Sequence, residues 1–146
     1  MKNRWGQIGA VLFMSSSAIA SEGMLALAAY ECHSVSINQE ISKICAAQSP
    51  DQAKRSGSAY AKWFARNVEK AKAASDACST QLTMLAKSDA DRKDVTEIRK
   101  KIENTKDAII EEVRGQVASK GSIACNEFLS QLETGCCAVD IKSPHW

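Results

Sequence analysis

The fold is decided by residues 88–121, which read SDADRKDVTEIRKKIENTKDAIIEEVRGQVASKG. Ser88 and Asp91 resemble a capping box, and Gly121 is suited to the end of a helix. Between these ends, apolar residues recur every three or four positions, the period of one helical face. They are Val95, Ile98, Ile102, Ile109, Val113 and Val117. The stretch therefore predicts one long helix from about Asp89 to Ser119, with charged residues on its opposite face.

The residues before this helix predict two more helices. Ser49 and Pro50 suit the N-cap and first helical position of a helix that reaches about Leu85. Its expected apolar stripe is Tyr60, Phe64, Val68, Ala71, Cys78, Leu82 and Leu85. Ser36 begins a shorter helix that ends near Gln48 and places Ile37, Ile41, Ile44 and Cys45 on one face.

A fourth helix is predicted after residue 121. It runs from Ser122 to about Thr134 and ends at Gly135. Ile123, Phe128, Leu129 and Leu132 are its apolar residues. No stretch alternates apolar and polar residues in the manner of a strand. We therefore expect an all-α fold: a small antiparallel bundle of about four helices, cross-linked by disulfides.

Residues 1–20 have the pattern of a secretory signal peptide. Lys2 and Arg4 precede an apolar run, and Ala18-Ile19-Ala20 offers a small-x-small cleavage site. Cleavage there leaves Ser21 as the mature N-terminus, although a cut after Ala28 or Ala29 also fits. We expect a periplasmic or extracellular protein with a helical domain at 21–135 and a cysteine-containing tail at 136–146.

The charge of the chain changes when the signal is removed. The full sequence carries 19 basic and 17 acidic side chains. Lys2 and Arg4 lie in the signal, which has no acidic residue, so the mature chain is neutral. Neutrality gives no support to a nucleic-acid partner, whose footprint is a basic surface. The apolar run of the signal is too short to span a bilayer, and we expect no stable membrane insertion after signal cleavage.

All six cysteines follow the predicted cleavage sites: Cys32, Cys45, Cys78, Cys125, Cys136 and Cys137. An even number in an exported chain predicts a disulfide framework. With short turns between antiparallel helices, Cys45 and Cys125 lie at the same end and are expected to pair. Cys136 and Cys137 are not expected to bond each other, because the eight-membered ring strains the peptide. One should take Cys32 and the other Cys78.

The cysteines and histidines also allow other kinds of site. Cys32-His33 and Cys136-Cys137 could bind a soft metal such as Cu(I) if reduced, although no C-x-x-C is present. Neither of the two histidines, His33 and His145, has an obvious constellation of a carboxylate and a nucleophile around it. Motifs for phosphate binding, zinc proteolysis or serine hydrolysis do not occur. We expect no cofactor and no enzymatic activity.

One basic feature remains in the second predicted helix. Lys62, Arg66 and Lys70 are four residues apart and share a helical face, with Trp63 beside them. They are either a solvated face, with Trp63 at the edge of the core, or a contact patch for an acidic partner. In the second case Trp63 or Phe64 is the anchor, and Arg66→Glu should leave stability nearly unchanged.

These observations favour a small exported, non-enzymatic binding protein of the cell envelope. It would contact another envelope or secreted protein, as an inhibitor or immunity factor does. The alternative is a soft-metal-binding or redox stress protein that uses the cysteines.

Overall fold

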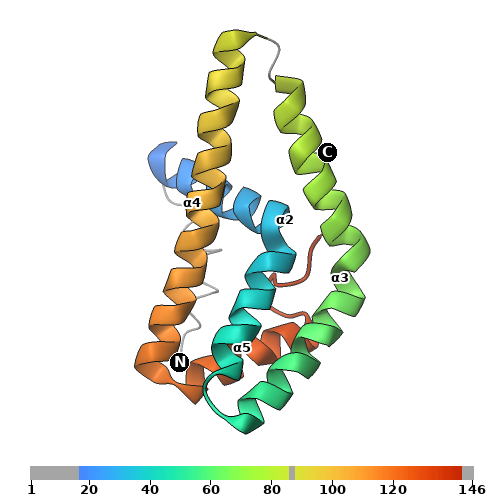
Figure 1. The fold of residues 1–146 in the computed structure, drawn as a ribbon, viewed down its shortest axis with the longest axis vertical. Coiled ribbons are helices and arrows are strands. Elements are labelled where there is room, and N and C mark those ends of the chain that lie inside the picture. Colours follow the sequence, from blue (N-terminus) through green and yellow to red (C-terminus); the bar gives the residue numbers. More distant parts are fainter. Residues whose placement is uncertain (1–16, 86–87, 143–146) are drawn as a thin grey trace.

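The computed structural model describes residues 17–85 and 88–142 (Figure 1). Over these residues the protein is all-α, as predicted. The helices are α2 (Ser17–Ala46), α3 (Pro50–Leu85), α4 (Asp89–Lys120) and α5 (Ser122–Thr134). The predicted signal peptide lies outside the described residues, except for its last four residues, which begin α2. No helix in the described part of the chain is long and apolar enough to cross a membrane.

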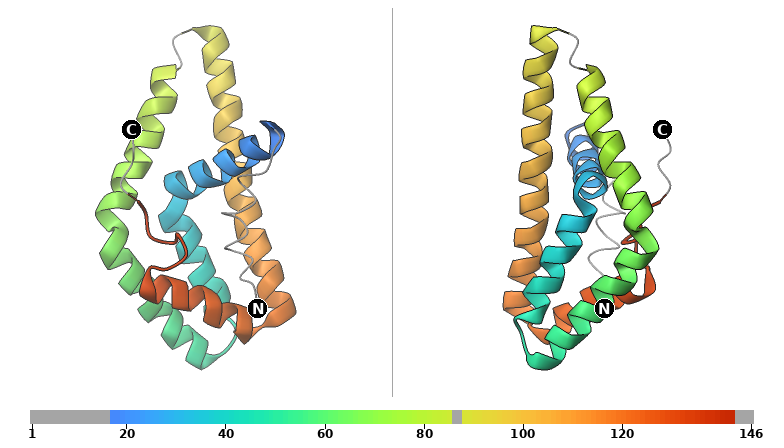
Figure 2. Two further views of the ribbon diagram at one scale, coloured as in Figure 1. Left: turned by 180° about the vertical axis from the view of Figure 1, so that it is seen from behind. Right: turned by 45° about the vertical axis from the view of Figure 1, so that its right-hand side comes forward.

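The long helices α3 and α4 run in opposite directions and diverge from their adjoining ends. Helix α2 packs between them where they are far apart, and α5 crosses the bundle near this wide end (Figures 1 and 2). We expected the fourth helix to stand antiparallel to its neighbours. Instead, the 13-residue α5 lies across the end of the bundle and packs mainly on α3. The direction of α5 places the residues that follow it beside the middle of α3.

The starts of α3 and α4 and the end of α5 lie where the sequence predicts them. The backbone N–H of Gln52 donates to Ser49 Oγ over 3.1 Å at the start of α3. At the start of α4, Ser88 and Asp91 form a reciprocal capping box with bonds of 2.9 and 3.1 Å. Gly135 ends α5 with φ 76°, a left-handed conformation that glycine adopts without a steric penalty.

Helix α2 is longer than predicted. Its expected start was Ser36, but helical structure begins at Ser17 and is interrupted by one kink at His33, with φ −130° and ψ 19°. Ala29, before the kink, is fully buried, and Tyr30 packs against the core. These tertiary contacts stabilise helical structure on the N-terminal side of Ser36, where the sequence predicted that the helix begins.

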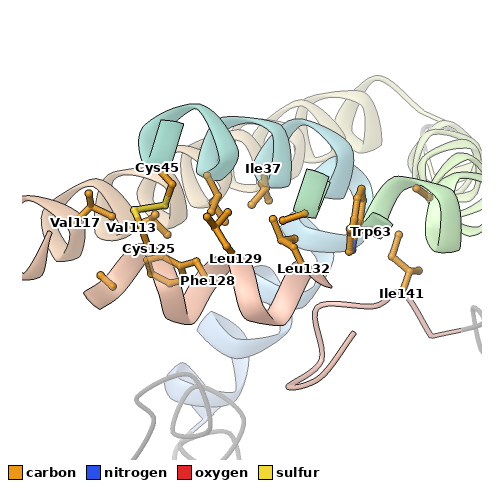
Figure 3. Close-up of a cluster of buried hydrophobic side chains, with 14 of the residues drawn as sticks. Ile37, Cys45, Trp63, Val113, Val117, Cys125, Phe128, Leu129, Leu132 and Ile141 are labelled. Carbon is orange, nitrogen blue, oxygen red and sulfur yellow. A yellow bond between two sulfur atoms is a disulfide. The ribbon is translucent and has the colours of Figure 1, made fainter. Parts of the chain in front are cut away.

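The core lies where α2, α3 and α5 meet, with part of α4 against it (Figure 3). On α4, Ile110 rather than Ile109 is fully part of the buried face, and Ile98 is partly exposed. On α5, Phe128, Leu129 and Leu132 are buried as predicted, but Ile123 is 68% exposed. Ile123 points outward because the buried face of this short helix begins at Ala124 and Cys125.

The buried face of α3 also differs from the predicted stripe. Its members are Gln52, Ser56, Ala59, Trp63, Asn67, Ala71 and Ala74. Trp63 is fully buried, whereas Phe64 is 37% exposed. The helix is therefore rotated by about one residue from the orientation that apolar spacing alone favoured. Among its polar members, Asn67 is fully hydrogen-bonded and Gln52 donates from Nε2 to Asn126, whereas Gln52 Oε1 and Ser56 Oγ have no hydrogen-bond partner among the described residues.

Two disulfides cross-link the described helices. Cys45–Cys125 joins α2 to α5, as predicted, and is fully buried (Figure 3). The predicted pairing of Cys32 and Cys78 with the C-terminal cysteines is wrong, because these two bond each other. Cys136 and Cys137 are exposed and free. The pairing assumed that α5 stands upright, whereas α5 is transverse and the loop that follows it leaves Cys136 and Cys137 exposed.

Candidate functional site

The residues after α5, 135–142, form a C-terminal loop that lies against α3 (Figure 2). The loop is anchored at Val139. Its carbonyl oxygen accepts one hydrogen bond from the Tyr30 hydroxyl over 2.5 Å and another from Trp63 Nε1 over 2.9 Å. Asn38 in turn donates from Nδ2 to the Tyr30 hydroxyl. Burial of Tyr30 raises the pKa of its hydroxyl, which stays protonated and remains a donor.

A second anchor follows at Asp140 and Ile141. Asn67, which is buried, donates to Asp140 Oδ1 over 2.8 Å and accepts from the Ile141 backbone N–H over 2.9 Å. The side chain of Ile141 is itself buried in the core. An asparagine can donate and accept at once, so this one residue satisfies both a carboxylate and a backbone group of the loop.

Arg66 ties the loop to the end of α5. Its guanidinium donates two hydrogen bonds to Asp140, each of 3.1 Å. It donates two more to the carbonyl oxygens of Leu132 and Glu133, over 2.7 and 3.1 Å. The last carbonyls of a helix have no partner within the helix, so Arg66 supplies a missing cap for α5.

Two acidic residues of this region face the basic side chains of α3. Arg55 forms paired hydrogen bonds of 2.9 Å with Glu133, and these bonds lower the pKa of that carboxyl against the opposing effect of burial. Burial of Asp140 would raise its pKa, but the hydrogen bonds from Arg66 and Asn67 outweigh it and the pKa is lowered. Both carboxylates are therefore ionised at neutral pH.

The structure does not keep the residues of the predicted contact patch together on one free surface. Lys62, Arg66 and Lys70 are exposed on α3, as expected. Trp63 is not an exposed anchor, because it is buried and bonded to Val139. Arg66 is not a free surface cation, since the chain's own Asp140 binds it. The carboxylates that this basic face would seek in a partner are supplied within the molecule.

The C-terminal loop also carries the two free cysteines. Both are exposed, and their Sγ atoms lie 2.6 Å apart. Cys137 and the next residue, Ala138, have positive φ values of 62° and 68°. Non-glycine residues rarely adopt this left-handed conformation, and two in succession require a fixed surrounding structure. The hydrogen bonds at Val139, Asp140 and Arg66 provide it on both sides of the pair.

No family model, curated protein or solved structure matches the chain.

The chemistry of the site therefore has to be argued from its geometry. Two sulfurs that share one tetrahedral zinc ion, at about 2.3 Å each, lie about 3.8 Å apart. A disulfide bond is about 2.05 Å long. The 2.6 Å between the Sγ atoms of Cys136 and Cys137 is closer to the second value. In addition, no group of three or more metal-ligating side chains occurs among residues 17–85 and 88–142. The pair is better suited to disulfide chemistry than to metal binding.

A separate cleft opens at the kink of α2, on the other flank of α3. It has a volume of about 480 Å³ and is lined by residues of α2 and α3. Phe64, Val68 and Ala71 give it an apolar floor, and an ion pair between Lys72 and Asp76 lies at its margin. Phe64 is the exposed aromatic ring of this region.

A smaller hollow of about 340 Å³ adjoins the Cys32–Cys78 disulfide between α3 and α4. His33 Nε2 lies 3.1 Å from Glu103 Oε1, and Lys106 lies 2.6 Å from the same carboxylate. The hydrogen bond from Lys106 lowers the pKa of Glu103. His33, for which the sequence indicated no partner, thus has a carboxylate beside it. His145 lies outside the described residues.

Sequence reasoning missed the residues that hold the C-terminal loop: Tyr30, Asn67 and Asp140. One signal was present, because Asn67 follows Trp63 by four residues and so shares its helical face. A buried tryptophan next to an asparagine on one face implies a polar partner in the core. The sequence does not reveal that this partner is the chain's own C-terminal backbone.

Proposed function

We propose that the protein is a small exported, non-enzymatic binding protein of the cell envelope. It acts by contact with another envelope or secreted protein, as an inhibitor or immunity factor does. Two features support the proposal. Cross-links between α2, α3 and α5 hold the frame rigid, which reduces the entropy lost on binding. The cleft at the kink of α2 exposes an aromatic ring in a concave, partly apolar surface.

The observation that carries the proposal is the position of Phe64. Lys62 and Phe64 are two residues apart, which separates them by about 200° around the helix. Phe64 therefore faces the cleft, whereas the basic face of Lys62 and Lys70 lies on the other side of buried Trp63. The contact surface that we propose is this cleft, with Phe64 as anchor. It suits a partner that inserts an apolar side chain beside the Lys72–Asp76 ion pair.

The test is a comparison of two charged variants in capture from a cell-envelope extract. Phe64→Glu places a carboxylate in the cleft, and Ile123→Glu places one on an exposed position of α5. Because both side chains are exposed, thermal melting should show that both variants fold. We expect one protein to be retained by the wild type and by Ile123→Glu and to be lost with Phe64→Glu.

The proposal fails if no protein is retained by the wild type. It also fails if Phe64→Glu retains the same protein, or if both variants lose it equally.

A second function, in redox stress, is favoured by one specific observation: the free, exposed pair Cys136–Cys137. Alkylation of thiols in intact cells, with and without an added oxidant, tests it. Two trapped thiols that disappear on oxidant treatment support the redox function. A thiol count that the oxidant does not change contradicts it.

A further inference from the structure

The C-terminal loop holds Cys136 and Cys137 in place from both ends. Towards α5, Arg66 binds the carbonyl oxygens of Leu132 and Glu133. On the other side, Val139 is fixed by Tyr30 and Trp63. The three intervening residues after Gly135 include two with positive φ. The loop therefore presents two solvent-exposed thiols that already lie 2.6 Å apart.

We infer that Cys136 and Cys137 are a thiol–disulfide exchange site, which closes a vicinal disulfide when it meets the disulfide of a small thiol. This inference extends the redox function proposed above. It rests on that function only for the claim that the pair meets an oxidant in the cell. The chemistry requires little movement, because the distance between the sulfurs must shorten by only about 0.6 Å to reach a bond.

The reaction has two exchange steps. In the first, the thiolate of one cysteine attacks a sulfur of the oxidant RS–SR, forms a mixed disulfide and releases RS⁻, which takes up a proton. In the second, the neighbouring thiolate attacks the protein sulfur of the mixed disulfide and releases the second RS⁻, which is also protonated. Each protein sulfur is oxidised by one electron, and two molecules of RSH carry away the two protons.

The strain of the eight-membered ring gives the site its character. A bond between adjacent cysteines distorts the peptide between them, which disfavours it as a permanent cross-link. Strained and exposed disulfides are also the more oxidising and more easily reduced ones. This strain therefore argues against a permanent disulfide between Cys136 and Cys137 and in favour of one that forms and breaks reversibly. The buried Cys45–Cys125 bond has neither property and should stay closed under the same conditions.

Equilibration of the native protein in mixtures of reduced and oxidised glutathione tests the site. Samples are quenched with acid, alkylated and cleaved after Glu133, which separates Cys136 and Cys137 from Cys125. We expect the fragment to change from doubly alkylated to unalkylated as the proportion of oxidised glutathione rises. Its mass should then correspond to the loss of two hydrogen atoms, while Cys32–Cys78 and Cys45–Cys125 remain closed.

Single variants are the matched controls. Cys136→Ser and Cys137→Ser each keep one exposed thiol in the same loop, and each should hold one glutathione as a stable mixed disulfide. Three results for the wild type would overturn the inference: stable glutathione adducts, thiols that remain alkylatable throughout the titration, or a bond from either cysteine to Cys32 or Cys78. None of these results depends on whether the thiol count in cells responds to an oxidant.

Discussion

Trp63 is the largest fully buried side chain of the described residues, and it connects the core to the C-terminal loop. Trp63→Ala should lower the free energy of unfolding by about 3–5 kcal/mol, because it removes both core contacts and the donor to Val139. The neighbouring Phe64→Ala, at a partly exposed ring, should cost about 1 kcal/mol. Urea denaturation of both variants measures the difference. Equal losses would place Trp63 outside the core.

Arg66 shows how a surface residue can be structural. Arg66→Ala removes four hydrogen bonds, two of them to a carboxylate, although the guanidinium and Asp140 are each one-third exposed. We expect a loss of about 1–3 kcal/mol in the free energy of unfolding. The charge reversal Arg66→Glu, expected from the sequence to be nearly neutral, should cost at least as much.

Lys62→Ala is the matched control for Arg66, because Lys62 is an exposed cation one helical turn away. Its effect should stay within about 0.5 kcal/mol. If Arg66→Ala were equally harmless by urea denaturation, the C-terminal loop would not depend on the guanidinium.

The capping box of α4 is the clearest local signal in the sequence, and the structure confirms it. Ser88→Ala removes the hydroxyl that accepts the Asp91 backbone N–H, which should lower the free energy of unfolding by about 0.5–2 kcal/mol. Ser58→Ala, on the exposed face of α3, is the control. It should be neutral or slightly stabilising, because alanine has the higher helix propensity. A Ser88→Ala variant as stable as Ser58→Ala in urea would refute the contribution of the cap.

At the scale of helices, most of the fold could be predicted from local signals. The starts of α3 and α4 and both ends of α5 follow from capping residues and glycine. The length of α2 could not be predicted, because it depends on the burial of Ala29 and on the packing of Tyr30 against the core. The rotation of α3 about its own axis could not be predicted from the sequence either. Periodicity scores Trp63 and Asn67 by hydrophobicity alone, whereas their burial depends on hydrogen bonds to the C-terminal loop.

The candidate sites were less predictable than the helices, because they depend on how the elements meet. The basic residues of α3 could be found by spacing, but their intramolecular carboxylates, Glu133 and Asp140, could not. The Cys45–Cys125 pair could be predicted, because both cysteines lie close to short turns at the same end of the bundle. Cys32–Cys78 could not be derived in this way, because Cys32 lies at the kink of α2, which the sequence did not predict.

The carboxylates of this region make the stability of the whole molecule depend on acid. The folded-state pKa values of Glu133 and Asp140 are lowered from ordinary values of 4.5 and 3.8. Groups with depressed pKa values stabilise the folded state above their unfolded pKa, and this contribution is lost as pH falls through the folded pKa. The contribution should be complete above about pH 5 and decline steadily below pH 4.

Chemical denaturation between pH 2 and 6 measures this dependence. The double variant Glu133→Gln/Asp140→Asn should be less stable at pH 6 and should lose less stability on acidification than the wild type. Parallel curves for the two proteins would show that these carboxylates do not link folding to pH.

The two disulfides close large loops, with separations of 46 and 80 residues along the chain. On the chain-entropy argument each contributes about 4 kcal/mol, so loop size does not separate them. Burial does. Cys45 and Cys125 are fully buried, whereas Cys32 and Cys78 are partly exposed beside a hollow. A thiolate must reach a sulfur to exchange with it, so access decides the order of reduction in the native state.

We therefore expect dithiothreitol to reduce Cys32–Cys78 first in the native protein, and Cys45–Cys125 only when the end of the bundle opens. Timed alkylation with peptide mapping measures the order. Addition of urea below the unfolding midpoint should accelerate the second step more than the first, because opening exposes the buried sulfurs. Reduction of Cys45–Cys125 first would mean that the contact of α2 with α5 opens more readily than the contact of α2 with α3. The rigid part of the molecule would then lie at the kink of α2, and the proposed cleft would be its most constrained surface.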